Sequence, residues 1–490
     1  MVQHKVIIIG AGIGGLTAGA LLARAGFEIM VIDQADRIGG CCQCFTRSGH
    51  RFDAADSMFL GCGPQGYNSL HYVFQKLGLT FELAELDPCY TFEVPGQRFA
   101  VGRDLSALIK EMSSHDPDRE RQLRRFHSTL NIFRRAVDRI PFERPLTPKE
   151  GLTWLLKNWW VLPLLSIGDR LPFTRLLHYA VSDPTLKSIL NYQLKAFVPD
   201  NPGRTPALLA AILLTETHRG GLHYPRGGSG RFAASLRNVI KKAGGSFLLS
   251  NRVTEILVKN ERVQGVRLAT GELIEANYVI SNASCWSTYG QLIKSDHLPA
   301  KWLQRVHSLK PTSSMFICYL SLDKDFVESQ FAMHTLWPKE TTHNPALMLC
   351  IPSLVDPTSA PQGKHTGMLY CQASYQDWQG SKNYNQQKNK EIEHLLQNLD
   401  QRVPGARSHV QVLDAASPLT IERYTGRDFG SSGGPLSSVD QWHARNLPQK
   451  TPLSGLFHVG DSTFPGSGVV AVTISGIIAA DQLQHEHHGQ

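Results

Sequence analysis

Residues 6–15 read Val-Ile-Ile-Ile-Gly-Ala-Gly-Ile-Gly-Gly, and this stretch decides the fold. The apolar run Val6–Ile9 leads into a glycine-rich turn and then into the apolar segment Leu16–Ala25. A second apolar run, Phe27–Ile32, follows and ends at Asp33. Strand, glycine turn, helix, strand and acid, in that order, match the dinucleotide-binding fingerprint G-x-G-x-x-G. The sequence therefore predicts a parallel βαβ unit that binds the phosphates of a dinucleotide.

Each glycine of this turn has its own task in that interpretation. Gly10 permits the tight turn, Gly12 lets the backbone approach a pyrophosphate, and Gly15 lets the helix pack closely on the sheet. Phosphates would lie at the helix N-terminus, where free N–H groups and the helix dipole favour anions. The Asp33 carboxylate suits a ribose 2′-hydroxyl and disfavours a 2′-phosphate.

Composition limits the class of protein. A chain of 490 residues is too long for one core and predicts two or three domains, and its 42% hydrophobic and 19% charged residues are typical of a globular protein. The formal net charge of +8 fits nucleic acid or an anionic membrane surface. Because no helix-turn-helix, zinc finger or RNA-binding motif accompanies it, we expect no nucleic acid, and either a membrane face or an ordinary solvated basic surface.

The cysteines and the N-terminus indicate the compartment. Nine cysteines are too sparse for a disulfide scaffold, so a reducing compartment is expected. Cys41, Cys42 and Cys44 cluster without a second Cys/His pair at zinc spacing, which favours packing beside a cofactor and predicts no metal site. The first strand begins at Val6 and leaves no room for a signal peptide, so secretion by that signal is not expected.

Charge and chain breaks divide the sequence into three regions. The stretch Leu105–Ile140 is a long, charged helical segment that is broken at Asp116-Pro117, and it opens a helical insertion. Later strands alternate with one polar helix near Gln386–Leu399, which suits a substrate-domain sheet. We expect a discontinuous nucleotide-binding domain (1–105, 222–299 and 440–490), the helical region (106–221) and the sheet of the substrate domain (300–439).

The segment Leu152–Ile167 is the most apolar part of the chain. A helix that spans a membrane needs about 20 apolar residues, and Lys157 and Pro163 interrupt this one too early. Its three tryptophans and the flanking basic residues suit a segment lying in a membrane interface. A buried core helix with aromatic packing explains the same pattern, and the sequence leaves both alternatives open. The tryptophans are Trp154, Trp159 and Trp160, and the basic residues are Arg144, Lys149, Arg170 and Arg175.

Several motifs carry a family resemblance. The run Arg37-Ile38-Gly39-Gly40 resembles the R-x-G-G element that follows the first βαβ unit in two-dinucleotide-domain flavoproteins. The stretch from Gly49 to Ser57 resembles the G-x-x-F-D-x-x-x-S segment of the phytoene desaturase family, which passes close to the flavin. Tyr224-Pro225-Arg226-Gly227-Gly228 resembles the Y-P-x-G-G element of carotenoid desaturases and isomerases. The resemblance covers essentially the whole chain and is thin in the helical region.

A second glycine loop lies near the C-terminus. The short strand Leu456–Val459 leads into Gly460-Asp461, a glycine-rich loop, and an apolar helix that ends at Leu483. The Asp461 carboxylate can accept hydrogen bonds from polyol hydroxyls, and the backbone at Val469 and Val470 can stabilise negative charge on a reduced flavin. Paired with the first glycine turn, this loop predicts FAD, a long cofactor that spans both. We expect the remaining tail, residues 484–490, to be disordered.

The resemblance implies a set of site residues. The loop from Gly460 to Gly476 looks like the C-terminal motif of plant and cyanobacterial carotenoid cis-trans isomerases. The segment from Glu422 to Asp428 resembles the family's substrate-side segment, which makes Glu422, Arg423, Arg427 and Asp428 the catalytic candidates. The cofactor candidates are Gly10, Gly12, Gly14, Gly15, Asp33, Gln34, Arg37, Gly39, Gly40, Asp56, Ser57, Val253, Asn282, Gly460, Asp461, Gly468, Val469 and Val470.

These residues and the resemblance imply an α/β two-dinucleotide-domain flavoprotein with a Rossmann-like FAD domain, a mixed sheet-and-helix substrate domain and a helical membrane-facing insertion. The implied activity is cis-to-trans isomerisation of poly-cis carotenes such as prolycopene, with reduced FAD and no net redox change. Carotene desaturases and polyene or retinol saturases are alternatives, and a flavin amine oxidase or a non-enzymatic lipid carrier is less favoured. We expect a peripheral location on the cytoplasmic side of a membrane, and the oligomeric state stays open.

Overall fold

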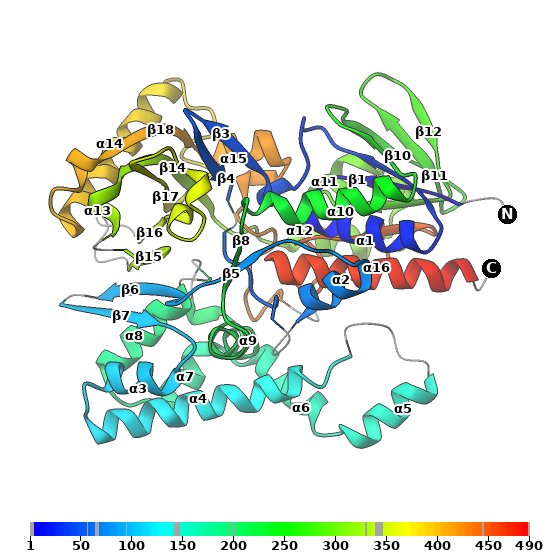
Figure 1. Ribbon diagram of the computed structural model, residues 1–490. Coiled ribbons are helices and arrows are strands. Elements are labelled where there is room, and N and C mark those ends of the chain that lie inside the picture. Colours follow the sequence, from blue (N-terminus) through cyan, green and yellow to red (C-terminus); the bar gives the residue numbers. More distant parts are fainter. Residues whose placement is uncertain are drawn as a thin grey trace.

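The computed structural model describes residues 4–488 except 56, 64–67, 95, 142–147, 196, 199, 201, 329–330, 339–345 and 443–444. Three parts are visible in Figure 1: a parallel-sheet unit with its helices, a second and larger sheet with α14, and a layer of helices below both. The N- and C-termini lie at the same end of the parallel-sheet unit (Figure 1).

The parallel-sheet unit is built around the first βαβ motif. Its five strands pair in parallel in the order β19-β13-β1-β2-β9. They are β1 (Lys5–Ile9), β2 (Glu28–Ile32), β9 (Ser246–Leu248), β13 (Tyr278–Ser281) and β19 (Leu456–His458). The central strands are buried on both faces, which is why they are nearly continuous apolar runs.

Alternate residues of β1 belong to two different cores, because successive side chains of a strand point to opposite faces. Val6 and Ile8 pack with the helices α1 (Ile13–Arg24), α10 (Gly230–Lys242) and α16 (Val469–His488). Ile7 and Ile9 pack toward a three-stranded antiparallel sheet on the other face. That sheet consists of β10 (Val253–Lys259), β11 (Arg262–Leu268) and β12 (Leu273–Glu275). The predicted βαβ unit is present as β1, α1 and β2.

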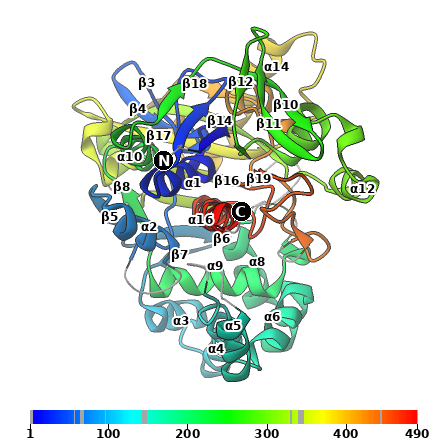
Figure 2. The same cartoon turned by 90° about the vertical axis from the view of Figure 1, so that its right-hand side faces the viewer.

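Helices α1 and α16 cross at glycine. A Cβ atom on Gly476 of α16 would lie 2.5 Å from the carbonyl oxygen of Gly14 in α1, so only glycine fits at this contact. Figure 2 shows α16 end-on beneath α1. The helix runs to His488, and Glu486 pairs with Lys450 at 3.3 Å. The expectation of a disordered tail was therefore wrong for residues 484–488, because the apolar helix packs far enough along the sheet unit to order its polar end.

The larger sheet has seven strands in the order β18-β14-β17-β16-β15-β6-β7. The polar helix that the sequence predicts near Gln386–Leu399 is α14, and it packs on this sheet. The elements are β6 (Tyr90–Val94), β7 (Gln97–Val101), β14 (Ser314–Asp323), β15 (His334–Trp337), β16 (Leu347–Cys350), β17 (Lys364–Ala373), β18 (Val410–Ala416) and α14 (Tyr384–Arg402).

One pairing differs from the expected domain division. The hairpin β6–β7 lies within residues 1–105, which we assigned to the nucleotide-binding domain, yet β6 pairs in parallel with β15 of the larger sheet. Strands that pair across more than 240 residues leave no local signal in the sequence, because the pattern of a strand does not indicate which other strand it will pair with. The other boundaries of the three regions stay a prediction.

The helical layer consists of the helices from α3 to α9 along the chain. Its helices are α3 (Leu105–Ser113), α4 (Pro117–Val137), α5 (Pro148–Lys157), α6 (Val161–Arg170), α7 (Phe173–Ala180), α8 (Pro184–Lys195) and α9 (Ala207–Arg219). The break at Asp116-Pro117 is confirmed, and Asp116 caps α4 by accepting hydrogen bonds from the N–H groups of Asp118 and Arg119.

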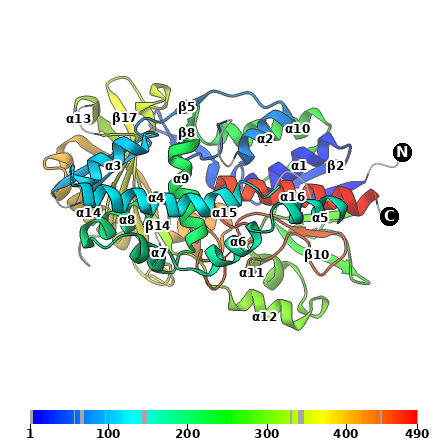
Figure 3. The ribbon, with the colours of Figure 1, turned by 90° about the horizontal axis from the view of Figure 1, so that it is seen from below.

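The apolar segment Leu152–Ile167 is two helices rather than one. Helix α5 ends at Lys157 and α6 begins at Val161, with Trp159 and Trp160 between them. Trp159 is 70% exposed, whereas Trp154 and Trp160 are half-buried against the core. We name the exposed large side chains the apolar surface; they are Leu152, Leu155, Leu156, Trp159, Leu162 and Ile167. Figure 3, seen from below, shows α5 and α6 on this face of the molecule.

The alternative of a wholly buried core helix is therefore wrong for this segment, because its large apolar side chains divide between core and solvent. No helix in the described ranges is long and apolar enough to cross a membrane. The remaining elements are β3 (Cys44–Arg47), β4 (His50–Asp53), α2 (Ser69–Leu77), β5 (Leu83–Glu85), β8 (His223–Pro225), α11 (Cys285–Ser287), α12 (Ala300–Ser308), α13 (Lys324–Glu328) and α15 (Pro418–Thr425).

Candidate active site

A single cavity of about 1600 Å³ lies between the parallel-sheet unit and the larger sheet. Its polar end is formed by the first glycine turn, the segment after β2 and the loop after β19. Its other end is formed largely by apolar side chains of the larger sheet and of α8 and α9. These include Phe92, Tyr192, Leu209, Ile212, Leu213, Leu336 and Met348, and Trp442 from the segment before β19 also lines the cavity. Ligand pockets usually measure about 300–1000 Å³, so the cavity can hold a cofactor and a substrate together.

The first glycine turn has the backbone that the sequence predicts. Gly10 has φ +96°, in the region that favours glycine, and its N–H donates to the carbonyl of Ile32 at 2.8 Å. A Cβ on Gly12 would lie 2.6 Å from Nδ2 of Asn282, and one on Gly15 would lie 2.6 Å from the carbonyl oxygen of Gly10. Side chains at these positions would fill the turn and separate the helix from the strand.

Asp33 holds the end of the turn. Its Oδ2 accepts the N–H of Ala11 at 2.6 Å and its Oδ1 accepts the N–H of Ala35 at 2.8 Å. Burial raises the pKa of Asp33, while these two backbone hydrogen bonds oppose the rise. Gln34 and Val253 line the same end of the cavity.

The Arg37-x-Gly-Gly run packs on the glycine turn. Gly39 has φ +110° and donates its N–H to the carbonyl of Ala11 at 2.8 Å, and a Cβ on Gly40 would lie 3.5 Å from the Cα of Gly12. Arg37 lines the cavity but its side chain is half exposed and pairs with Asp36 at 3.0 Å. The two motifs are thus one folded unit around the polar end of the cavity.

Two residues of the desaturase-like segment have different standing. Asp56 lies outside the described residues. Ser57 lines the cavity, and its Oγ is 3.1 Å from Nε2 of the fully buried His334. Burial lowers the pKa of His334 to about 4, so its imidazole is neutral at pH 7.

The C-terminal loop meets the first glycine turn across Asn282. A Cβ on Gly14 or on Gly460 would lie 2.8 Å from Oδ1 of Asn282, so the amide fits between two glycines. Gly460 has φ +100° and Gly468 has φ +97°. Val469 and Val470 begin α16 and line the cavity, and the first turn of this helix therefore faces the cavity.

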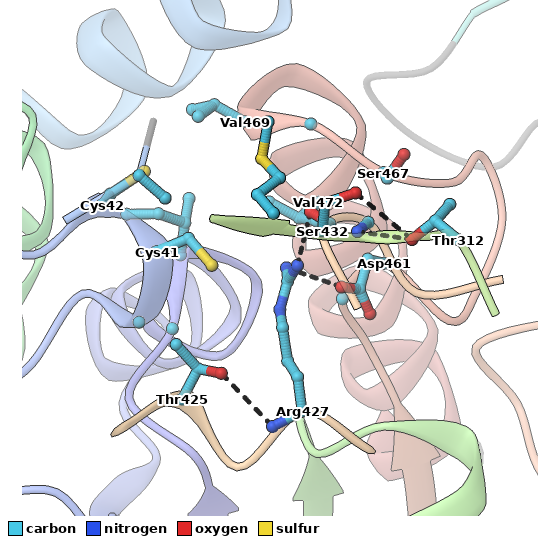
Figure 4. Close-up of a pocket in the computed structure, with 18 of the residues that line it drawn as sticks. Cys41, Cys42, Thr312, Thr425, Arg427, Ser432, Asp461, Ser467, Val469 and Val472 are labelled. Carbon is cyan, nitrogen blue, oxygen red and sulfur yellow. Dashed lines mark hydrogen bonds and ion pairs between the residues drawn. The ribbon is translucent and has the colours of Figure 1, made fainter. Parts of the chain in front are cut away.

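Asp461 is held by an ion pair. Its Oδ2 lies 2.6 Å from Nη2 of Arg427, and both side chains are mostly buried. Nη1 of Arg427 donates to the carbonyl of Ser432 at 2.7 Å. Figure 4 shows Arg427 extending toward Asp461, with Cys41 and Cys42 on the opposite wall and Val469 and Val472 beyond. The pairing joins a predicted cofactor residue to a predicted catalytic one.

The four catalytic candidates all line the cavity, but protein groups already engage three of them. Oε2 of Glu422 accepts the hydroxyl of Tyr375 at 2.8 Å. Oδ2 of Asp428 accepts the hydroxyl of Ser287 at 2.8 Å, and Arg427 pairs with Asp461. The exposed Arg423 stacks 5.6 Å over the ring of Tyr424. These contacts suit positioning better than proton transfer, and the catalytic roles stay predictions.

Sequence reasoning missed several residues of this site. One is His334, which contacts Ser57. Another is Thr312, whose hydroxyl oxygen accepts the N–H of Gly433 at 2.9 Å. Neither residue belongs to a recognisable sequence motif. The apolar end of the cavity also went unpredicted, because its side chains come from distant strands and helices. In the described ranges, no three His, Cys, Asp or Glu side chains converge as ligands for a metal ion.

The polar end of the cavity fits a dinucleotide. Gly12, Gly14 and Gly15 leave open space that a Cβ atom would fill. Backbone N–H groups and a helix N-terminus at this end favour anions. The Asp33 carboxylate suits ribose hydroxyls. The model of the flavin-containing amine oxidoreductase family matches residues 13–484. The chain therefore belongs to this family, and it is an FAD-dependent oxidoreductase.

Individual relatives narrow the comparison to proteins that act on carotenoids. Chloroplastic prolycopene isomerase of Daucus carota is 28% identical over 498 residues, which cover 98% of this chain and 80% of the relative. The 4,4′-diapolycopene oxygenase of Methylomonas sp. is 27% identical, with 98% of each chain covered. The neurosporene-forming phytoene desaturase of Cereibacter sphaeroides is 28% identical, with 97% and 94% covered.

The fold also occurs in solved structures. An oxidoreductase from Methanosarcina mazei is 21% identical, with 96% of this chain and 99% of that chain covered, and the TM-score is 0.68. At this identity the likeness concerns the fold alone. It confirms the α/β architecture with mixed sheets and helices that the sequence predicted.

Proposed function

We propose that the protein is a carotenoid cis-trans isomerase that acts on poly-cis carotenes such as prolycopene. One observation carries the proposal: a single cavity joins the glycine cradle to a mainly apolar chamber. A carotene is an apolar polyene and needs apolar walls, because burying hydrocarbon surface is the main source of its binding free energy. The similarity to prolycopene isomerase over 98% of the chain supports this choice.

We assign the polar end of the cavity to FAD. Asp33 would bind the ribose, Gly12 and Gly14 the pyrophosphate, and Asp461 the polyol chain. The first turn of α16, at Val469 and Val470, would face the flavin ring and favour negative charge on it. Arg427 would hold the Asp461 carboxylate in place through their 2.6 Å ion pair. The other cofactor candidates remain assigned as the sequence suggests.

The chain's own residues would orient the polyene and exclude water. A cis double bond of a long polyene rotates only when its double-bond character is lowered transiently, and reduced FAD would supply the electrons or proton that do so. The apolar chamber would keep water away from this step and fix the polyene against the cradle. Within the substrate-side segment, Glu422 and Asp428 would act as positioning residues, because Tyr375 and Ser287 already donate hydrogen bonds to them.

An anaerobic assay tests the reaction. Enzyme loaded with FAD and kept reduced is incubated with poly-cis lycopene, and the products are resolved by chromatography and absorption. Conversion to all-trans lycopene, without an added acceptor and without a change in the number of double bonds, is the expected result. Activity only with oxidised flavin and an electron acceptor, and a product with more double bonds, would establish a desaturase instead.

Desaturation is the second candidate, and the relatives favour keeping it. Phytoene desaturase matches the chain at the same 28% identity as the isomerase does. Both reactions would use the same cavity, since one fold hosts several chemistries. An amine oxidase acting on a polar substrate is less compatible with the apolar walls at the far end of the cavity.

We also propose that the protein attaches peripherally to a membrane through α5 and α6. Leu156 is 71% exposed, Trp159 is 70% exposed and Ile167 is 54% exposed, although soluble proteins rarely expose several large apolar side chains together. Carotenes are insoluble in water, so their route to the cavity should begin in lipid. Two short amphipathic helices with an exposed tryptophan between them suit the headgroup boundary of a bilayer.

A further inference from the structure

A basic depression lies beside the helical layer, away from the cavity. Its volume is about 660 Å³, and four cationic side chains line it: Arg204, Arg305, Lys310 and Arg445. One carboxylate, that of Asp440, also lines it, together with the hydroxyls of Ser308 and Ser438 and the amide of Gln441. The depression therefore offers several hydrogen-bond donors around an excess of positive charge.

The charges do not cancel. Arg204 pairs with Asp440, and Nη1 of Arg445 lies 2.5 Å from Oδ2 of Asp169. Nη2 of Arg305 instead donates to the backbone carbonyls of Arg445 and Asn446, at 2.8 and 2.7 Å. Neither Arg305 nor the exposed Lys310 has a carboxylate partner within the part of the chain that the structure describes. Two positive charges thus remain unmatched in one depression.

The shape of the depression is fixed by its neighbours. Gln441 accepts the N–H of Lys310 at 3.2 Å and donates to its carbonyl at 2.7 Å, so the backbone that carries the lysine is clamped. The N–H of Val439 donates to the carbonyl of Arg204 at 2.9 Å. The backbone at Lys310 and at Arg204 is therefore held by hydrogen bonds before any ligand arrives, which lowers the entropic cost of binding.

The depression adjoins the apolar surface. Asp169, which pairs with Arg445, lies on α6 two residues beyond the exposed Ile167. The segment that carries Arg204 runs along the end of α6, because Thr205 accepts the N–H of Phe173 and the N–H of Ala207 donates to Leu171. Figures 2 and 3 place α6 and α12, which carries Arg305, on the same side of the molecule.

We propose that the basic depression binds the phosphate of an anionic membrane lipid while the apolar surface enters the headgroup boundary. The proposal rests on the peripheral membrane attachment described above and adds a lipid class to it. A phosphate matches the two unmatched cations in charge and can accept hydrogen bonds from the guanidinium, ammonium, hydroxyl and amide groups around it. Apolar contact alone would bind zwitterionic and anionic lipids equally.

Vesicle co-sedimentation of the FAD-loaded protein tests the proposal. One set of vesicles contains phosphatidylcholine alone, and the other contains phosphatidylcholine with phosphatidylglycerol. We expect the wild type to bind the anionic vesicles more tightly, and Lys310→Gln to lose about fivefold of that binding, as one juxtamembrane cation contributes. Lys310→Gln should not change binding to phosphatidylcholine. The side chain is exposed, so the variant should fold normally.

Lys242→Gln is the matched control, since Lys242 is an exposed lysine on α10, outside the depression. Equal loss in Lys242→Gln and Lys310→Gln would overturn the proposal in favour of general surface charge. Inorganic phosphate that binds the wild type but not Lys310→Gln, and that displaces the protein from anionic vesicles at matched ionic strength, would assign the depression to free phosphate instead of lipid.

The Trp159→Ser variant separates the two proposals. It should weaken binding to both kinds of vesicle, whereas Lys310→Gln should affect only the anionic ones. If wild type binds neither vesicle, the membrane attachment itself is wrong. If wild type binds both equally and Lys310→Gln changes nothing, attachment stands and the lipid phosphate site is wrong.

Discussion

The parallel-sheet unit and the α5–α6 segment treat their apolar residues in opposite ways. In the unit, the strand residues Val6–Ile9 are wholly buried, and even the turns are closed by glycines. In the α5–α6 segment, six large apolar side chains are exposed, five on the helices and Trp159 between them, although the helices also contact the core. A buried apolar run stabilises the fold, whereas an exposed one lowers solubility and needs another explanation, for which we propose contact with lipid.

The interior of the helical layer is closely packed, and a substitution of the buried Arg134 tests how far its stability depends on buried charges. Its fully buried side chain lies 2.7 Å from Glu216 Oε2 and 2.8 Å from Asp138 Oδ1. Arg134→Met should lower the free energy of unfolding by about 3–5 kcal/mol, because it leaves a buried carboxylate uncompensated. Urea denaturation followed by circular dichroism measures the change.

The exposed pair Arg124–Glu120 on the same helix provides the control. Arg124→Met should cost about 0.5 kcal/mol. Arg134→Met combined with Glu216→Gln should recover much of the lost stability. If both single variants cost the same, the interior of the helical layer does not depend on its buried charges, and the contrast with its exposed edge disappears.

The glycine cradle should respond differently to substitution. Gly12→Val places a Cβ 2.6 Å from Nδ2 of Asn282 and fills the space assigned to the pyrophosphate. Overpacking costs about 1–3 kcal/mol, which would lower flavin affinity about 5- to 150-fold. The ratio of flavin to protein absorbance after reconstitution with FAD measures this loss.

Gly290→Ala is the control for Gly12→Val, since no heavy atom lies within 4 Å of a Cβ at this position. It should bind flavin like the wild type. Gly12→Val with Asn282→Ala should regain stability without regaining flavin. Full flavin content in Gly12→Val would show that the cofactor lies elsewhere.

Local sequence predicted the parts of the molecule that local chemistry determines. The turn from Gly10 to Gly15, the acid Asp33 and the loop from Gly460 need particular backbone angles or contacts that few residue types provide, so residue identity reveals them. The pairing of β6 with β15 and the contact of Arg427 with Asp461 depend on distant segments meeting. A sequence motif names neither partner of such a contact.

The α5–α6 segment shows a second limit. Composition placed tryptophans and basic residues there, but Trp159 is exposed while Trp154 and Trp160 are half-buried, and only the packing of the neighbouring helices decides this. The apolar end of the cavity was hidden for the same reason, since Phe92, Leu213 and Met348 come from two strands and a helix.

A buried histidine in the helical layer should make the stability of the protein depend on pH. Both ring nitrogens of His127 on α4 lack a hydrogen-bond partner in the described ranges, His218 faces it at 5.8 Å, and burial lowers the pKa of His127 to about 3. Its unfolded pKa is about 6.5, so the unfolded chain binds the proton more readily and stability falls as the pH drops from about 6.5 toward 3.

His127→Leu isolates this contribution. Wild type should lose about 2 kcal/mol more than the variant between about pH 7.5 and pH 5, because one pKa unit corresponds to about 1.4 kcal/mol. At pH 7.5 the variant should be as stable as the wild type or more so, since it removes unsatisfied polar atoms. Urea midpoints at the two pH values measure both. Parallel pH profiles would mean that His127 stays neutral in both states or reaches solvent.

The smallest effect concerns the exposed edge itself. Trp159 is 70% exposed between α5 and α6, whereas Trp160 beside it is half-buried in the core. Trp159→Ser should leave the urea midpoint unchanged and weaken partition into phosphatidylcholine vesicles about tenfold, near the lower bound for burying a large apolar side chain. Trp160→Ser should instead lower stability through lost packing.

Leu273→Ser, which replaces an exposed apolar residue on β12 in the parallel-sheet unit, is the control and should change neither quantity. If Trp159→Ser and Leu273→Ser partition alike, the exposed apolar residues of α5 and α6 have no special relation to lipid. If only Trp159→Ser loses vesicle binding, the two regions differ in function as well as in packing, because the same kind of exposed side chain then binds the bilayer in one region and does nothing in the other.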